Sequence, residues 1–110
     1  MIVEYIRYAL APGVSAVFEQ AYAEAAVSLD QSEHCLGYEL CRCAEDASRY
    51  ILRIEWTSAE GHMQGFRNSA LFAPFFKAVR PYVGQIEEMR HYQPTAVRGN
   101  GAGVSNRGVA

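Results

Sequence analysis

The order of apolar and polar residues predicts four strands and two helical regions. Alternation with a period of two predicts strands at 2–10, 35–43, 49–57 and 84–92. Between the first two strands, apolar residues recur at steps of three and four, which is typical of the buried stripe of a helix. The residues of that stripe are Val14, Phe18, Ala21, Tyr22, Ala25 and Leu29.

The second helical region is expected in two pieces. Thr57 or Ser58 can cap the first piece, and Glu60 stands three residues after Thr57, as in a capping box. The predicted inner stripe of this piece is Ala59, His62, Met63 and Phe66. The second piece begins near Ser69, and its apolar residues are Phe72, Phe75, Phe76 and Val79.

The order strand–helix–strand–strand–helix–strand predicts a ferredoxin-like α+β fold. Two right-handed crossovers place both helices on the same face of one antiparallel sheet. One domain is therefore expected over 1–92. Residues 93–110 are mainly Gly, Ala, Asn, Ser and Arg without periodicity, and we expect a disordered tail there.

The face of the sheet that no helix covers predicts a homodimer. It is expected to carry Val3, Tyr5, Arg7, Ile51, Arg53 and Glu55. This set of residues is too apolar to be exposed to water and too charged to form an ordinary hydrophobic core. A second copy of the same face would bury the apolar residues and let arginine and glutamate pair across the contact.

Composition excludes several classes of function. The chain has 110 residues, a formal net charge of −2 and no basic cluster, so we expect no nucleic-acid partner. No apolar run approaches the roughly 20 residues that cross a bilayer, so no membrane association is expected, and the first residues do not resemble a signal peptide. The three cysteines, an odd number, are expected as reduced thiols in the cytoplasm. Their spacing does not match a zinc site, and no metal is predicted.

Several short motifs resemble those of the antibiotic biosynthesis monooxygenase family. They are Pro12-Gly13, Phe18, the run 35–40, the run 49–52, Glu55-Trp56-Thr57-Ser58, and Phe66 through Ser69 to Phe72. The resemblance covers about 2–92 and implies a dimeric α/β-barrel protein. The Glu-Trp-x-Ser element is fairly specific for the fold, but relatives include monooxygenases, haem-degrading enzymes, isomerase-like proteins and many of no known activity.

The resemblance implies a reaction that needs neither metal nor flavin. In the quinone-forming members of the family, the protein binds and deprotonates a phenol, and the anion gives an electron to O2. Such a pocket needs an apolar wall, a base, and a donor that stabilises the developing anion. A small aromatic substrate and no cofactor are therefore the expectation for this chain.

Trp56 and His62 are the candidate catalytic residues. Trp56 matches the family's strand-end tryptophan, whose indole N–H can donate to a substrate oxygen; alternatively, it only anchors a helix to the sheet. His62 follows six residues later and is a candidate base that titrates near neutrality, or else a half-exposed residue without chemistry. The candidate substrate-binding residues are Glu4, Tyr8, Tyr22, Phe66, Arg67, Phe72, Phe76 and His91.

Two of these residues have open alternatives. Glu4 stands on the apolar face of the first strand, so it is either paired or functional with a raised pKa. His91 belongs to the pocket if its side chain faces the helices, and to the dimer contact otherwise.

Two other functions are alternatives to the monooxygenase. Haem degradation is not expected, because Phe76 and Ile6 stand where that branch of the family carries its histidine and asparagine. The remaining rival is a dimeric small-molecule-binding or stress-associated protein without catalysis, in which the phenylalanines only form the core.

Overall fold

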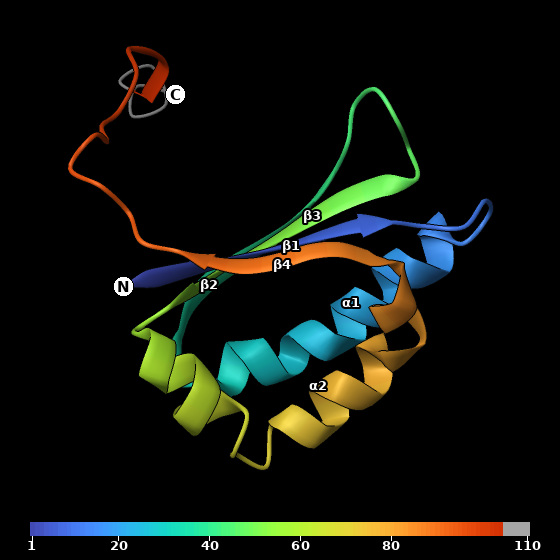
Figure 1. The fold of residues 1–110 in the computed structure, drawn as a ribbon, viewed down its shortest axis with the longest axis horizontal. Coiled ribbons are helices and arrows are strands. Elements are labelled where there is room, and N and C mark those ends of the chain that lie inside the picture. The colour runs from blue at the N-terminus through green and yellow to red at the C-terminus, as the bar shows by residue number, and fades with distance from the viewer. Residues whose placement is uncertain (105–110) are drawn as a thin grey trace.

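A four-stranded antiparallel sheet with helices on one side makes up the domain (Figure 1). The computed structural model describes residues 1–104. The strands are β1 Ile2–Ala9, β2 Cys35–Arg42, β3 Arg49–Trp56 and β4 Ile86–Tyr92, in the order β2-β3-β1-β4. The helical segments are α1 Ser15–Gln31, the π-helix Gly61–Phe66, α2 Phe72–Val79 and the 3-10 helix Arg80–Gln85. This arrangement confirms the predicted ferredoxin-like α+β fold.

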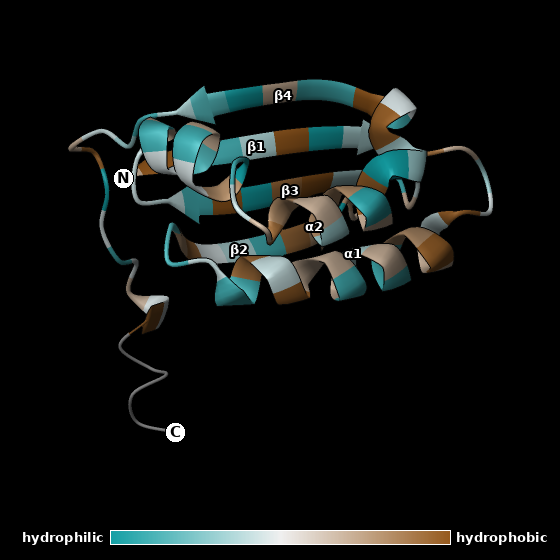
Figure 2. Ribbon diagram, turned by 90° about the horizontal axis from the view of Figure 1, so that it is seen from below, coloured by the Kyte–Doolittle hydropathy of each residue, from teal (hydrophilic) through white to brown (hydrophobic). Residues whose placement is uncertain are grey.

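The core lies between the sheet and the helices, which lie on the near side of the sheet in Figure 2. The inward residues of β3 are at most 2% exposed, as the alternation predicted; they are Tyr50, Leu52, Ile54 and Trp56. On α1, Phe18 is fully buried, and the centroid of its ring lies 4.8–5.1 Å from those of four tyrosines. Aromatic packing of this kind holds α1 against the sheet.

Two bulges change which residues of the edge strands face the core. The register of β2 against β3 shifts next to Cys35, so Cys35 packs against the core and Leu36 is 56% exposed. The register of β4 against β1 also shifts, and Ile86 pairs with Tyr8 and packs against the core. The prediction that Leu36 shares a face with Leu40, and Cys35 with Cys41, was wrong. Each bulge inserts one residue, which reverses the faces of the residues beyond it.

The first piece of the second helical region is a π-helix. The carbonyl of His62 accepts a hydrogen bond from the N–H of Arg67, five residues later, at 3.2 Å. Ser58, rather than Thr57, supplies the cap, because its Oγ accepts the N–H of Gly61 at 2.8 Å. The wider turn changes which side chains point inward: His62 is buried, but Met63, predicted on the inner stripe, is 43% exposed. Short π-helical segments often occur at functional sites.

His34 lies in the turn before β2, and its ring packs against this π-helix. A Cβ atom on Gly65 would lie 2.4 Å from Cδ2 and Nε2 of the His34 ring, and one on Gly61 would lie 3.3 Å from its Nδ1. Only glycine leaves room for the ring at Gly65. These contacts fix the position of the helix that carries His62.

The open face of the sheet differs in detail from the prediction. Arg53 and Glu55 pair within one chain, at 2.5 Å between Nη1 and Oε2, and Val3 is already 4% exposed without a partner. Residues 93–104 leave β4 and run away from the sheet (Figure 1). The disorder predicted for the tail falls partly on 105–110, which lie outside the described residues. In the described part, no helix is long and apolar enough to cross a membrane.

Candidate active site

A cavity of about 160 Å³ lies between the sheet and the helices. Nine of the ten residues predicted for the site line it. The strands contribute Glu4, Tyr8 and Trp56. The remaining six come from the helical side: Tyr22, His62, Phe66, Arg67, Phe72 and Phe76. The tenth, His91, contacts His62.

The polar end of the cavity is built on Glu4, which is 2% exposed. The indole N–H of Trp56 donates to Oε1 of Glu4 at 3.1 Å. His62 is 4% exposed, and its Nε2 lies 3.6 Å from the same oxygen. The imidazole of His62 stacks on the indole, with 4.4 Å between centroids and 10° between planes. Of the two alternatives for Glu4, the structure shows the paired one, and the carboxyl group also borders the cavity.

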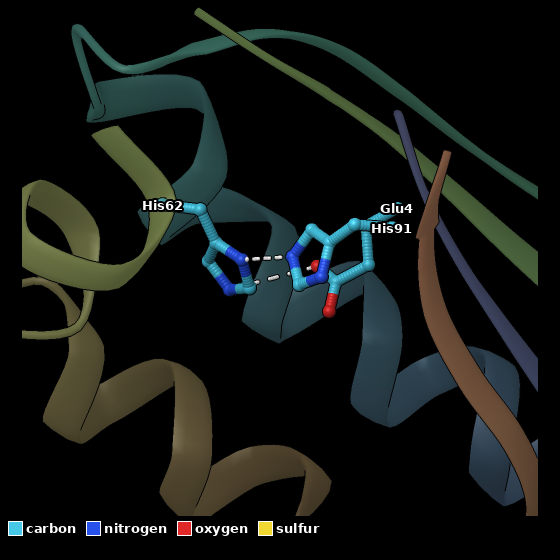
Figure 3. Close-up of side chains that lie close together, drawn as sticks. All are labelled: Glu4, His62 and His91. Atoms are coloured by element: carbon cyan, nitrogen blue, oxygen red, sulfur yellow. Dashed lines mark hydrogen bonds and ion pairs between the residues drawn. The ribbon is translucent and has the colours of Figure 1, made fainter. Parts of the chain in front are cut away.

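His91 faces the helices rather than the open face of the sheet. It pairs with Glu4 in the register of β4 against β1, so both side chains leave the sheet on the same side. Its Nε2 lies 2.7 Å from Nδ1 of His62, at hydrogen-bond distance (Figure 3). Because His91 itself is exposed, it connects the buried His62 to the surface. We call Glu4, His62 and His91 the Glu–His–His cluster.

Burial shifts the pKa values of the two buried members of this cluster in opposite directions. Desolvation raises the pKa of Glu4, although the Trp56 N–H and the charges of His91 and Arg67 act against it. Desolvation, with the positive charges of His91 and Arg67, lowers the pKa of His62 to about 4. This lowered pKa makes His62 a weaker base than a histidine that titrates near neutrality. At pH 7 its imidazole is neutral and has a lone pair to accept a proton.

Tyr8 and Tyr22 supply hydroxyl groups elsewhere in the cavity wall. Their hydroxyls hydrogen-bond to each other. Burial raises the pKa of Tyr8 to about 12, and that of Tyr22 is raised by burial and by Tyr8. Both phenols are protonated at neutral pH, so at this place the cavity offers hydroxyl groups and no charge.

The outer wall of the cavity is aromatic and partly open. The rings of Phe72 and Phe76 stack at 5.7 Å, and Phe76 is 37% exposed. The guanidinium carbon of Arg67 lies 5.9 Å from the centroid of the Phe72 ring. Arg67 is exposed, so it can meet an anionic group where the cavity opens.

Sequence reasoning missed part of the apolar lining and the contact between the two histidines. The missed lining residues are Ile6, Ile54, Phe75, Val79, Val83, Ile86 and Met89. Alternation along the last strand did place Met89 and His91 on one face. It could not say which face, because the bulge in β4 decides this.

Comparison with known proteins agrees with this architecture. The family model of antibiotic biosynthesis monooxygenases matches residues 1–78, which include Glu4 and His62 but not His91. A structure from Bordetella bronchiseptica named for the same family is 31% identical, with a TM-score of 0.71, over 86% of this chain and 96% of that chain.

Two further relatives extend the comparison. SnoaB, a cofactor-independent oxygenase from Streptomyces nogalater, shares the fold, with 19% identity and a TM-score of 0.68 over 89% of this chain and 94% of that chain. The uncharacterised Bacillus subtilis protein YczJ is 25% identical over 93 residues, which are 84% of this chain and 98% of YczJ. The match of the family model over most of the chain shows that this protein belongs to the antibiotic biosynthesis monooxygenase family.

Proposed function

We propose that the protein is a monooxygenase that oxidises a phenol or hydroquinone with O2 to a quinone, without a cofactor. The observation that carries this proposal is the neutral, buried His62 held between Trp56 and Glu4 at the polar end of an apolar cavity. Membership of the family and the shared fold with SnoaB support oxygen chemistry.

The cavity favours a substrate with one aromatic ring. Its volume is about 160 Å³, and an apolar cavity of about 150 Å³ is known to take up benzene. The ring would lie against the phenylalanines and its hydroxyl would point to His62. A polycyclic substrate would need the half-exposed Phe76 to move aside.

In the proposed first step, His62 accepts the phenolic proton. An ordinary phenol has a pKa of about 10, and that of His62 is about 4, so the transfer alone is uphill by about 8 kcal/mol. The carboxyl group of Glu4, 3.6 Å from Nε2, offsets part of this cost by pairing with the imidazolium. The proton can also pass from Nδ1 to His91 at 2.7 Å, and from there to water.

For Trp56 we propose a supporting role in place of the catalytic one expected from the sequence. Its N–H already donates to Glu4, so it is engaged and does not point freely at a substrate oxygen. We assign Trp56 as a positioning residue that orients Glu4 and supports the His62 ring by stacking.

The oxidation then balances as phenol plus O2 giving quinone plus water. The phenolate transfers one electron to O2, and the phenoxyl and superoxide radicals combine to form a bond between a ring carbon and oxygen. Loss of the hydrogen at that carbon breaks the O–O bond and leaves the second carbonyl. The oxygen that departs takes up that proton and the one held by the histidines, and becomes water.

Oxygen uptake tests this proposal directly. The tag-free protein is assayed with a chelator present against single-ring hydroquinones and phenols, and against two-ring analogues for size. We expect uptake with a single-ring substrate, and a fall of roughly 10²- to 10⁴-fold in His62→Ala. Met63→Ala, which changes the exposed neighbour, is the matched control and should keep the rate.

The results of this assay test the choice of His62 as the base and the monooxygenase function separately. Full activity in His62→Ala would show that another group is the base. No uptake above buffer with any substrate would overturn the monooxygenase proposal.

The low pKa of His62 favours one second candidate, a binding protein without catalysis. A weak base is sufficient to accept a hydrogen bond from a bound hydroxyl. Saturable binding of a phenol, measured by calorimetry, without oxygen uptake would support this candidate.

A further inference from the structure

We propose that the Glu–His–His cluster is a binding site for a divalent transition-metal ion. One ligand atom from each of Glu4, His62 and His91 lies within 4.8 Å of the other two. Figure 3 shows the three side chains converging, with His62 coming from the helical side and the other two from the sheet. This inference goes beyond the proposed function, which uses the cluster without a metal.

The ligand set determines the class of metal. Two imidazoles and one carboxylate suit first-row ions such as Zn²⁺ and Fe²⁺, and leave positions for water or substrate. Hard ions such as Mg²⁺ and Ca²⁺ prefer oxygen ligands and fit this set poorly.

The present distances are close to those that a metal requires. Ligand atoms about 2.0–2.1 Å from a tetrahedral ion lie about 3.3 Å apart. The 3.6 Å approach to Glu4 uses Nε2 of His62, whereas the 2.7 Å approach to His91 uses its Nδ1, and one ion can take only one of these two nitrogens. The two imidazole rings must therefore turn as well as move apart by about half an ångström. His91 is exposed, which allows its ring to turn until all three ligands face one ion.

The surroundings supply what a metal centre needs besides ligands. The Trp56 N–H holds Oε1 of Glu4, and carboxylate ligands commonly have such a supporting donor. The exposed His91 gives the ion a path from the surface. Glu4 and His62 border the cavity, so a remaining coordination position can face it.

Metal binding and the proposed base exclude each other, because both use a lone pair of His62. A bound ion should therefore suppress the oxidation that the metal-free protein carries out. The two proposals fail independently: a protein that binds no metal can still consume O2, and an inactive protein can still bind the ion.

Titration of the metal-free, tag-free protein tests the site. Zn²⁺ binding is measured by calorimetry, and Co²⁺ binding by its visible absorption. We expect one ion per chain, and at least about tenfold weaker binding in Glu4→Gln and in His91→Ala. Glu24→Gln, which changes an exposed carboxylate on α1 outside the cluster, is the matched control and should bind as the unchanged protein does.

Competing explanations are resolved by two further measurements. The exposed Cys41 and the nearby Cys43 are alternative ligands, so the titration is repeated in the double variant Cys41→Ser/Cys43→Ser. Thermal unfolding without metal shows whether each variant is folded. His91→Ala changes an exposed residue, so this variant should fold. The proposal is overturned if no saturable binding occurs, if folded cluster variants bind as tightly as the unchanged protein, or if binding disappears with the two cysteines.

Discussion

At the scale of single residues, burial sets the chemistry of this site. Glu4 lies on a face that is otherwise apolar, where a carboxylate is costly unless it is hydrogen-bonded. The Trp56 N–H lowers this cost, and the neighbouring His62 is neutral. Glu4, Trp56 and His62 are thus interdependent, and a change in one alters the protonation of the others.

Tyr8, in the wall of the cavity, gives a prediction of how the stability of the fold depends on pH. Its folded-state pKa is raised to about 12, so the folded protein holds this proton more tightly than the unfolded chain does. The resulting stabilisation is complete below about pH 10, is lost as pH rises toward 12, and amounts to about 3 kcal/mol. Urea unfolding between pH 8 and pH 11 should show stability falling with increasing pH.

The control for this prediction removes both hydroxyls of the pair. Tyr8→Phe/Tyr22→Phe leaves no hydroxyl without its partner, and its stability should depend less on pH above pH 9. Tyr92→Phe changes an exposed tyrosine and should keep the dependence of the unchanged protein. If the double variant and the unchanged protein lose stability in parallel, the buried pair is not responsible.

At the scale of elements, the position of His62 depends on the π-helix and on its packing against His34. We predict that Gly65→Ala destabilises the fold by about 1–3 kcal/mol, because the added methyl group would lie 2.4 Å from the His34 ring. Urea unfolding gives the free energy. Gly84→Ala, where nothing lies within 4 Å of an added Cβ, is the control and should change stability little.

A second substitution shows whether this contact is the cause. In His34→Ala, the ring that the new methyl group would meet is absent, so Gly65→Ala should then cost much less. Equal costs with and without the His34 ring would show that this contact is not the cause of the destabilisation.

The elements also show how far the sequence predicts this structure. The alternation along β3 and the stripe of α1 predicted their buried faces, because both are regular and each packs against the core on one side. The two bulges and the π-helix do not follow a fixed period. Alternation therefore groups Leu36 with Leu40 and Ile86 with Tyr92, and the helical stripe includes Met63, whereas the structure separates them.

The candidate site was likewise predicted where a local pattern or the family resemblance indicates a residue, and missed where a bulge decides its position. Glu4 was noticeable as an acid on an apolar face, and Trp56 and His62 came from the family resemblance. The contact of His62 with His91 depends on a bulge and on residues 29 positions apart. No local spacing indicates such a ligand set, so the sequence predicted no metal site.

At the scale of the whole molecule, one face of the sheet has no helix over it. The helices cover only one side (Figure 1). On the other side Tyr5 and Ile51 are partly exposed, and Arg53 bonds to both Tyr5 and Glu55. This internal pairing reduces the charge that a partner must neutralise, and it makes the face more suitable for burial.

We predict that the protein is a homodimer that associates through this face. Sedimentation should show a dimer at micromolar concentration. Ile51→Lys places a charge on β3 opposite Arg7 of β1, and two copies of the changed face would repel each other. The dissociation constant of the dimer should therefore rise at least about tenfold.

Val17→Lys, on the outer surface of α1, adds the same charge at a position that is 62% exposed and should leave the dimer intact. A monomeric unchanged protein at micromolar concentration would contradict the prediction, and equal weakening by both lysine variants would show that net charge, not this face, controls association.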